Sequence, residues 1–523
     1  MAQQKSEDRV VPDGGVMPVQ PSGGGACGQG KAVPVEQTVV QLQLPIATAE
    51  DPVGSAREVV RDRSRAGRAG VPKAIVTGEK STLARMEEVV DRLDLAMKKV
   101  VANKGAPGPD GMTVGVLRQQ WPSIARRLRG ALLEGTYRLG GIRRVMIPKA
   151  GGGQRGLGIP NVTDRVVMEA VRQVLEPLFE PTFHPSSHGF RPGRSCHTAI
   201  AEAKQYVRDG HEWVVDIDLE KFFDRVNHQR LIARLATRVD DRRLLVLIAR
   251  MLKAKVVLPD GVVIGVDEGV PQGSPLSPLL SNIVLDELDA ELARRGHRFV
   301  RYADDCNVYV ASERAGIRVM ASLRGFIEGC LRLNVNDAKS AVARPQDRHF
   351  LGFSLRVARH GRRRVVEVLL SQRTKRNARD RIVRLTPRTW GGTLESCIAR
   401  VNVWLAGWHQ FFGIASADEQ QEMRRIDAHI RRRLRAIVLH HWKRQRTIAR
   451  RLIALGVKPQ SAWRAVYAGK KSTWALSHAP AVDHGLRNAY FAARGLTSAA
   501  VLHRYKRPPI SAPAHPIMAL EQG

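Results

Sequence analysis

Two adjacent aspartates stand in the run Arg301-Tyr302-Ala303-Asp304-Asp305-Cys306-Asn307-Val308-Tyr309-Val310. The residues on both sides of the pair are mostly apolar or aromatic, which is typical of two short strands joined by a tight turn. We therefore expect a hairpin that holds both carboxylates at its tip. Adjacent carboxylates repel each other, so a fold that keeps them together does so mainly to hold a hard cation. For an isolated pair, an ordinary Asp-Asp surface turn is the alternative.

A third carboxylate lies upstream, in Trp213-Val214-Val215-Asp216-Ile217-Asp218-Leu219-Glu220-Lys221-Phe222-Phe223-Asp224. The first seven of these residues alternate between apolar and acidic, which predicts a strand, and a helix is expected to begin at Glu220. A carboxylate at the end of this strand, beside a hairpin with two more, could hold two divalent ions. Two Mg²⁺ ions are the usual arrangement for nucleotidyl transfer, since one activates the attacking hydroxyl and the other holds the leaving pyrophosphate. Mg²⁺ binds few protein carboxylates together with substrate phosphates, which suits this sparse set.

The segment Tyr302-Ala303-Asp304-Asp305 resembles the polymerase motif of reverse transcriptases. The resemblance implies that Asp218 and Asp304 are the main metal ligands and that Asp305 supports the site or binds a metal ion transiently. It also implies that the main-chain carbonyl of Leu219 is a further metal ligand. The family's spacing before Phe-Phe-Asp favours Asp218, and Asp216 stays open as the alternative register.

Several other segments resemble blocks of the same family, in the family's order: Gly189-Phe190-Arg191-Pro192-Gly193-Arg194-Ser195, Pro271-Gln272-Gly273-Ser274-Pro275-Leu276-Ser277-Pro278, Leu333-Asn334-Val335-Asn336-Asp337-Ala338-Lys339-Ser340 and Phe350-Leu351-Gly352-Phe353. Upstream, Ile147-Pro148-Lys149 and Arg155-Gly156-Leu157-Gly158-Ile159-Pro160 resemble the fingers, although the family favours proline where this chain has Gly156. Lys149 and Arg155 would contact the triphosphate through charge-assisted hydrogen bonds. The resemblance implies further nucleotide contacts by Gln272, Gly273, Lys339 and Phe223. The Phe223 ring would exclude the ribose 2′-hydroxyl, unless it is simply a core aromatic.

Within this family, the chain is most similar to the group II intron-encoded reverse transcriptases, or maturases. Asn103-Lys104-Gly105-Ala106-Pro107-Gly108-Pro109-Asp110-Gly111 resembles their N-terminal extension block. Leu405-Ala406-Gly407-Trp408-His409-Gln410-Phe411-Phe412 and Ile426-Asp427-Ala428-His429-Ile430-Arg431-Arg432-Arg433-Leu434-Arg435 resemble their thumb, called domain X. Many such proteins end in a zinc-associated endonuclease domain with Cys-x-x-Cys pairs. The five cysteines of this chain stand singly, so it resembles the lineage without that domain, which is usually bacterial.

The resemblance implies an RNA-directed DNA polymerase that binds intron RNA, assists its splicing and supports retrotransposition. The implied partners are intron RNA, an RNA template with a DNA primer, target DNA and deoxynucleoside triphosphates. The implied setting is the bacterial cytoplasm, and no apolar run is long enough to predict a membrane span. Two other functions stay open. One is an RNA-binding maturase with incidental polymerase activity, and the other is a host-adopted reverse transcriptase in defence or repair.

The charge of the chain agrees with a polyanionic partner. It holds 84 Lys and Arg against 50 Asp and Glu, a net charge of +34. The excess is concentrated in residues 371–450. Residues 424–450 are expected to form a helix with a buried apolar stripe, Ile426, Ile430, Leu434, Ile437 and Val438. The basic residues on this helix that are expected to bind RNA are Arg431, Arg432, Arg435, Lys443, Arg444 and Arg446.

The fold class expected from these motifs is α+β, a right-hand polymerase with fingers, palm and a helical thumb. Fingers and palm are expected in residues 76–355, and the thumb or domain X in residues 370–455. Residues 1–75 contain no Phe, Trp or Tyr and carry Gly-rich stretches, so we expect them to be mostly disordered. Residues 456–523 are expected to form a basic C-terminal extension that either binds DNA or packs on the thumb. Residues 81–102 follow a helical period, with Ser81 as the expected N-cap.

Overall fold

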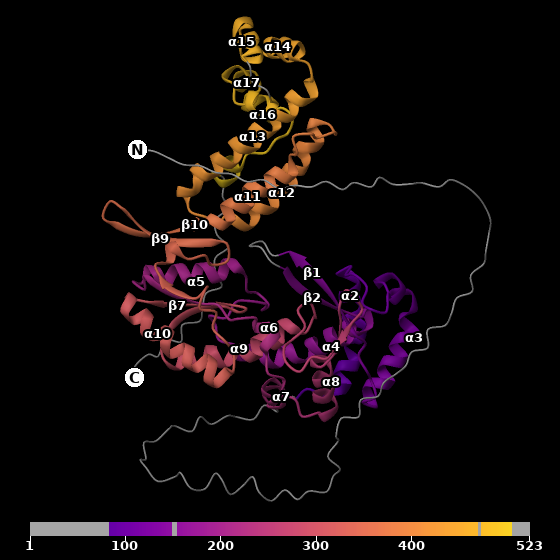
Figure 1. Ribbon diagram of the computed structural model, residues 1–523. Helices are drawn as coiled ribbons and strands as arrows, with labels where there is room; N and C mark the ends of the chain where they lie inside the picture. Colours follow the sequence, from indigo (N-terminus) through magenta and orange to yellow (C-terminus); the bar gives the residue numbers. More distant parts are fainter. Residues whose placement is uncertain (1–82, 149–153, 469–471, 505–523) are drawn as a thin grey trace, which may run out of the picture. The chain divides into compact units, whose positions relative to one another are not determined.

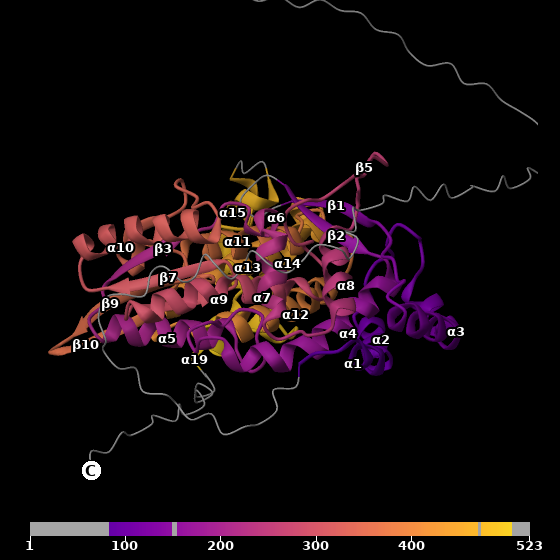
Figure 2. The same cartoon turned by 90° about the horizontal axis from the view of Figure 1, so that it is seen from below.

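The computed structural model describes residues 83–148, 154–468 and 472–504. Figures 1 and 2 show these residues in two views at a right angle to each other. The expectations for residues 1–75 and for Ser81 lie outside the described residues. Within these residues the structure combines helices with three small sheets, and the expected mixed α and β fold is confirmed (Figure 1).

The fingers region begins with helices and continues into a hairpin. Its elements are α1 (Met86–Asp91), α2 (Leu93–Ala102), α3 (Val114–Leu133), β1 (Ile142–Pro148), β2 (Gln154–Pro160) and α4 (Val162–Phe179). The expected helix over residues 81–102 is therefore two helices, because the chain breaks its helical run at Arg92. The hairpin joins β4 (Val256–Val257) and β5 (Val263–Ile264) in a sheet of order β2-β1-β4-β5.

The palm is a sheet of order β6-β7-β3-β8 with helices on both faces. Its strands are β3 (Trp213–Ile217), β6 (Arg298–Tyr302), β7 (Asp305–Val310) and β8 (Ala341–Ala343). Its helices are α5 (Cys196–Arg208), α6 (Phe222–Arg225), α7 (His228–Ala236), α8 (Arg242–Leu252), α9 (Ser277–Arg294) and α10 (Glu313–Phe326), which continues as a π-helical turn over Ile327–Leu331. In Figure 1, α5 lies above the sheet, and α9 and α10 lie below it.

The palm sheet separates two hydrophobic cores, because successive side chains of a strand point to opposite faces. Val214 belongs to the core that contains α5, whereas its neighbour Val215 belongs to the core that contains α9 and α10. The hairpin follows the same alternation, with Val308 in the α9 and α10 core and Tyr309 in the α5 core. The α5 core continues into the thumb, and the other core continues into the fingers helices.

The thumb follows a long hairpin, β9 (Phe353–His360) and β10 (Arg363–Leu370). Its helices are α11 (Gln372–Leu385), α12 (Leu394–Phe412), α13 (Gln420–Trp442), α14 (Gln445–Ala454) and α15 (Pro459–Tyr467). The expected single helix over residues 424–450 is wrong, because α13 ends at Trp442 and Lys443 takes a left-handed φ of 56°. The expected apolar stripe of α13 is confirmed as buried.

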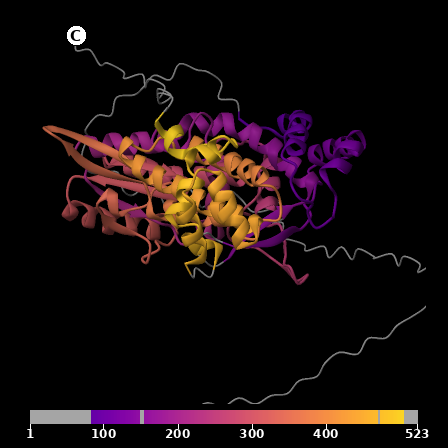
Figure 3. The same ribbon diagram turned by 90° about the horizontal axis from the view of Figure 1, so that it is seen from above.

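Four short helices follow the thumb helices: α16 (Thr473–Leu476), α17 (Pro480–Gly485), α18 (Asn488–Ala492) and α19 (Ala499–Arg504). The carboxylate of Asp427 in α13 accepts hydrogen bonds from the backbone N–H groups of Ala499 (2.7 Å) and Ala500 (3.1 Å) and from the Ser498 hydroxyl (2.6 Å). Asp427 thereby caps the start of α19. The described part of the C-terminal extension therefore packs on the thumb, as Figures 1 and 3 show.

Candidate active site

The turn between β6 and β7 carries the aspartate pair. Tyr302 pairs with Asp305 across the hairpin, so Ala303 and Asp304 form a two-residue turn. Ala303 has a φ of 58°, the positive φ that two-residue hairpin turns place at their first central residue. Asp304 thus occupies the turn itself, and Asp305 is the first residue of β7.

The third carboxylate, Asp218, reaches the same place from β3. This strand pairs antiparallel with β7, and the last pair of their register is Ile217 with Cys306. Asp218 is one residue beyond that pair, where the register points to Asp305. Its backbone is held on both sides, since its N–H donates to the Ser340 hydroxyl (3.0 Å) and its carbonyl accepts from the N–H of Asn336 (2.8 Å). The strand alternation therefore brings the three carboxylates together.

The electrostatics of the three aspartates reflect this crowding. Burial and then the charge of Asp218 raise the pKa of Asp304. Burial, followed by repulsion from Asp304, Asp216 and Asp218, raises the pKa of Asp305 to about 7, although the Asp305 residue keeps solvent access. The ammonium of Lys339 lies 3.3 Å from Asp218 Oδ2 and offsets part of the repulsion. Carboxylates that raise one another's pKa repel each other when ionised, and a bound cation relieves this repulsion.

Asp216, the alternative register, is already paired. Arg348 donates to Asp216 Oδ2 from Nε (2.8 Å) and from its terminal nitrogen (2.6 Å). Both bonds end on one carboxylate oxygen, so the charge of Asp216 is already paired with a guanidinium. The geometry thus favours Asp218 over Asp216 as the partner of the hairpin.

These aspartates offer the oxygen donors that Mg²⁺ prefers. Within the residues that the structure describes, no group of three His, Cys, Asp or Glu side chains is arranged as a complete metal site. Mg²⁺ in polymerase sites takes only one or two carboxylates and completes its shell with water and substrate phosphates. Asp218 and Asp304 fit this pattern, because the strand register places Asp218 opposite Asp305, next to the turn that carries Asp304.

The fingers strand β2 brings a cation to the same site. Arg155 Nε donates to Gln272 Oε1 (2.6 Å), and its charge lowers the pKa of Asp304 against the effect of burial. The N–H of Gly158 donates to the Gln272 carbonyl (2.7 Å). Gly273 has a φ of +115°, and a Cβ there would lie 2.5 Å from the Gly158 carbonyl oxygen. Only glycine allows this approach of β2 to the loop. Lys149 lies outside the described residues.

Phe223 stands beside the same loop, nearly buried at 9% exposure. Its carbonyl accepts a hydrogen bond from the N–H of Val270 (2.6 Å), and its ring packs edge-on against Phe222 with the centroids 5.3 Å apart. The expected helix start at Glu220 is shifted, because Lys221 takes a left-handed φ of 48° and α6 begins at Phe222. The structure thus places Phe223 next to the residues that precede Gln272. The small exposed part of its ring agrees both with a contact to the ribose and with a core aromatic.

Sequence reasoning missed the residue that supports the turn from behind, Arg301. Its side chain is fully buried and donates to both carboxylate oxygens of Asp289, from Nε (2.7 Å) and from a terminal nitrogen (2.5 Å). It also donates to the Asn282 side chain (3.0 Å) and to the carbonyl of Ala303 (2.9 Å), the residue before Asp304. The signal that could have identified it is its position in the strand, two residues after the buried Phe299 and therefore on the face that alternation directs inward.

Comparisons with known proteins agree with this geometry. A family model for reverse transcriptase (RNA-dependent DNA polymerase) matches residues 147–355, and a model for the group II intron maturase-specific domain matches residues 375–453. Protein YkfC of Escherichia coli is 34% identical over 338 residues, which cover 56% of this chain and 87% of YkfC.

The chain belongs to the group II intron-encoded reverse transcriptases. Group II intron-encoded protein LtrA of Lactococcus lactis is 30% identical over 337 residues, 51% of this chain and 55% of LtrA, so the match spans about half of that relative. A solved structure, a partial Cas6-RT-Cas1–Cas2 complex, is 25% identical over 46% of this chain and 42% of its own chain, with a TM-score of 0.31. In the described part of this reverse transcriptase, no helix is long and apolar enough to cross a membrane.

The basic residues expected to bind RNA, in the maturase-specific region of this reverse transcriptase, fall into three groups by solvent exposure. Lys443, Arg444 and Arg446 are exposed around the break between α13 and α14. Arg431 and Arg432 are half-buried on α13. Arg435 is buried, donates to the Leu486 carbonyl (3.0 Å) and pairs with Asp483. Two nitrogens of Arg435 are thus occupied by the protein itself, and its contact with RNA stays a prediction.

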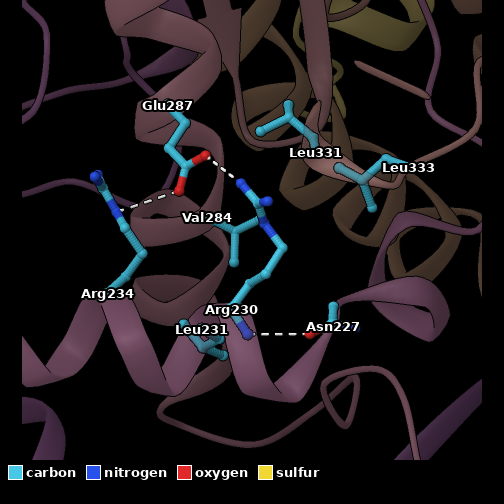
Figure 4. A pocket seen from close by; sticks show the side chains of 8 residues that line it. All are labelled: Asn227, Arg230, Leu231, Arg234, Val284, Glu287, Leu331 and Leu333. Atoms are coloured by element: carbon cyan, nitrogen blue, oxygen red, sulfur yellow. Dashed lines mark hydrogen bonds and ion pairs between the residues drawn. The ribbon is translucent and has the colours of Figure 1, made fainter. Parts of the chain in front are cut away.

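A separate small hollow lies between α7 and α9 of the palm (Figure 4). Arg230 and Arg234 line it, and both point to Glu287, which they reach at 2.7 Å and 3.6 Å. The hollow holds about 10 Å³. Its arginines are neutralised by Glu287, and its volume is about the least that one water molecule needs. It therefore offers no room for a substrate and is not part of the candidate active site.

Proposed function

We propose that this reverse transcriptase extends a DNA primer on an RNA template with Asp218, Asp304 and Asp305 as its catalytic carboxylates, and that its thumb binds intron RNA to assist splicing. The observation that carries the proposal is the convergence of these three aspartates from β3 and the β6–β7 turn, with Arg155 within electrostatic reach of Asp304. The primer 3′-hydroxyl attacks the α-phosphate of the incoming deoxynucleoside triphosphate, and pyrophosphate leaves.

Asp218, Asp304, Asp305 and the carbonyl of Leu219 would hold two Mg²⁺ ions. When bound, these ions lower the pKa of the attacking hydroxyl and neutralise the charge of the leaving pyrophosphate. Arg155 binds the triphosphate through charge-assisted hydrogen bonds, and Gln272 holds the Arg155 side chain in place. Lys339, now on Asp218, can turn to a phosphate oxygen once Asp218 gains another cation. Lys149 is proposed to contact the triphosphate on the family resemblance alone.

The remaining partners follow from the family. We propose that exposed Lys443, Arg444 and Arg446 contact intron RNA, since cations that no carboxylate neutralises in the described structure attract phosphate. Target DNA is proposed as the partner of the later integration step. A bacterial cytoplasmic setting is also proposed, because the relatives YkfC and LtrA come from bacteria.

The test of the active site is the substitution Asp304→Asn. It keeps the shape of the turn and removes the charge that a divalent ion requires, so primer extension in Mg²⁺ should fall to background while RNA affinity stays at the wild-type value. Asp337→Asn is the matched control, because Asp337 is an exposed aspartate of the block that contains Lys339 and its carboxylate pairs with Arg324, away from the turn. Extension by D304N at more than a few per cent of the wild-type rate would remove Asp304 from the proposal.

A further inference from the structure

One face of α13 is lined by positive charge instead of apolar side chains. Ala428, Arg431, Arg432 and Arg435 stand at the spacing i, i+3, i+4 and i+7, so they share one face of the helix. The short helices α16 and α17 lie beside α13 (Figure 1). Between α13 and the segment from His478 to Asn488 is a hollow of about 540 Å³, which we call the α13 pocket. Its lining is Ala428, His429, Arg431, Arg432, Arg435, His478, Asp483 and Asn488.

The α13 pocket has more positive charge than its own acid neutralises. Its acid, Asp483, pairs with Arg435. Among the described residues no carboxylate pairs with Arg431 or Arg432. The pocket therefore keeps a net charge of about two positive units even with its histidine side chains neutral, an excess that favours an anionic ligand.

Two buried nitrogens of the α13 pocket also lack a hydrogen-bond partner among the described residues. Arg432 Nε and His429 Nε2 are both buried atoms with no hydrogen-bond partner in the described structure. Leaving a buried polar group unsatisfied costs about 1–3 kcal/mol, and more when the group is charged. A ligand with several acceptor oxygens would satisfy them. Burial and repulsion from Arg433, Arg379 and Arg432 lower the pKa of His429, so a neutral imidazole is available there to donate or accept.

Trp474 fixes the orientation of Arg432. The Arg432 guanidinium lies over the indole, 3.7 Å from the ring centroid, and that of Arg388 lies 4.5 Å from the same centroid. A stacked guanidinium keeps its edge free for hydrogen bonds in its own plane. The nearby Arg433 is different, because it donates to the carbonyls of Thr386 and Val383 at the end of α11. Arg432 is thus held in place before any ligand arrives, which lowers the entropy cost of binding.

We propose that the α13 pocket binds one backbone phosphate of RNA, with Arg431 and Arg432 as its ligands and Trp474 as the residue that positions Arg432. This proposal rests on the proposed RNA binding by the thumb and adds a defined site to it. A phosphodiester offers two charged oxygens, which suit two neighbouring guanidinium groups. Lys443, Arg444 and Arg446 do not line this pocket, so their phosphate contacts are separate.

The first experiment compares arginine reactivity in the full chain by phenylglyoxal labelling, read residue by residue with mass spectrometry. Inorganic phosphate, titrated at constant ionic strength, should slow the labelling of Arg431 and Arg432 about threefold at twice its Kd. It should leave Arg444 and Arg446 unchanged, since these exposed residues form no enclosed site. A folded group II intron transcript should protect all four. Because this measurement uses the wild-type protein, no variant has to fold.

The second experiment compares two variants that each lose two positive charges, R431Q/R432Q and R444Q/R446Q. The α13 pocket accepts a single phosphate, so R431Q/R432Q should reduce the salt slope of log K for the intron transcript by only roughly 0.7–0.9. R444Q/R446Q should reduce the slope by up to twice that amount and keep the response to inorganic phosphate. Trp474→Leu, which changes no charge, should weaken the protection of Arg432 by phosphate and leave the reactivity of Arg444 unchanged.

Four other results would contradict the proposal that the α13 pocket binds a backbone phosphate of RNA. Protection of Arg431 and Arg432 by neither probe would show that the hollow is not a phosphate site. Protection by inorganic phosphate but not by the transcript would show a site for a free phosphate ligand instead of RNA. If the transcript protected only Arg444 and Arg446, the proposed thumb function would stand without the pocket. If it protected none of the four arginines, the thumb function itself would fail.

Discussion

Arg301 and Asp289 form a bidentate ion pair with no solvent exposure on either side chain, directly behind the turn that presents Asp304. The same guanidinium donates to the carbonyl of Ala303 and to the hydroxyl of Ser187. The pair therefore connects the hairpin that carries Asp304 to α9 and to the segment before the Gly189 block. A buried pair of this kind contributes little net stability, but the loss of one partner leaves an uncompensated charge.

Replacement of Arg301 should separate stability from catalysis. Arg301→Met should cost about 3–5 kcal/mol of unfolding free energy, because Asp289 loses its partner in the core. Arg301→Lys keeps the charge but cannot hold Ala303 and Asp289 at once, so it should lower kcat for primer extension and raise the Mg²⁺ concentration needed for half-maximal rate. Arg294→Lys on α9 is the control, since Arg294 is exposed and pairs with Glu291. A wild-type Mg²⁺ requirement in a folded R301K protein would make Arg301 purely structural.

Phe223→Val should relax the choice of sugar. If the small exposed part of the ring meets C2′ of the incoming nucleotide, a smaller side chain admits a ribose, and ribonucleotide incorporation should rise about tenfold relative to deoxyribonucleotide. The measurement is the ratio of single-nucleotide incorporation efficiencies. Phe222→Val is the matched control, because Phe222 is 2% exposed and packs against the same ring. An unchanged ratio in an active F223V enzyme would assign Phe223 to the core alone.

The buried Asp164 should make stability depend on pH. Burial raises the pKa of Asp164 from 3.8 to about 6, while hydrogen bonds from the Tyr137 hydroxyl (2.6 Å) and the Gly140 N–H (3.1 Å) oppose the shift. The folded state thus binds the proton more tightly than the unfolded state. The stability from this group is complete below about pH 4 and is lost as the pH rises to 6, by about 3 kcal/mol in all.

Asp164→Asn should remove that component. The unfolding free energies of the wild type and the variant are measured by urea unfolding between pH 4 and pH 7. The pH-dependent component is the change with pH in the difference between these two free energies. The difference should move in favour of the variant as the pH rises. Curves that stay parallel over this range would mean that the Asp164 carboxyl ionises without penalty in the folded protein.

Asp427→Ala should release α19 from the thumb. The substitution removes three acceptor contacts at the start of that helix, and loss of such a cap costs about 0.5–2 kcal/mol. Hydrogen exchange should become faster in residues 498–504 and stay unchanged in the palm strands. Asp380→Asn on α11 is the control, since this exposed aspartate is not part of the cap. Unchanged exchange in α19 would show that its apolar contacts with α13 hold it without the cap.

The catalytic hairpin and its strand could be predicted because their signals are local. The alternation around Asp304 and Asp218 gives the strands, and the paired carboxylates give the chemistry. The exact turn was harder, since only the register of β6 with β7 decides that Asp304 stands in the turn and Asp305 in the strand. The basic thumb could likewise be predicted as a region, but its break at Lys443 depends on one backbone torsion angle.

Partnerships between distant segments could not be predicted. Nothing local in the sequence indicates that Arg348 neutralises Asp216, that Arg155 meets Gln272, or that Asp483 pairs with Arg435. Each pair is formed by elements that packing brings together. The same reason applies to Arg435. Its place in a run of arginines suggests an RNA contact and gives no sign that Asp483 of α17 pairs with it.

The division of the palm core by the β3 sheet has a consequence for engineering this enzyme. A slip of β3 by one residue would exchange Val214 and Val215 between two compartments that are packed independently, and it would turn Asp218 away from Asp304. Two separate sets of neighbours therefore oppose the same slip. By the same alternation Asp218 lies on the face of Val214, toward α5 and the thumb, so substitutions for heat resistance belong in the compartment of α9 and α10, on the face away from the Asp218 side chain.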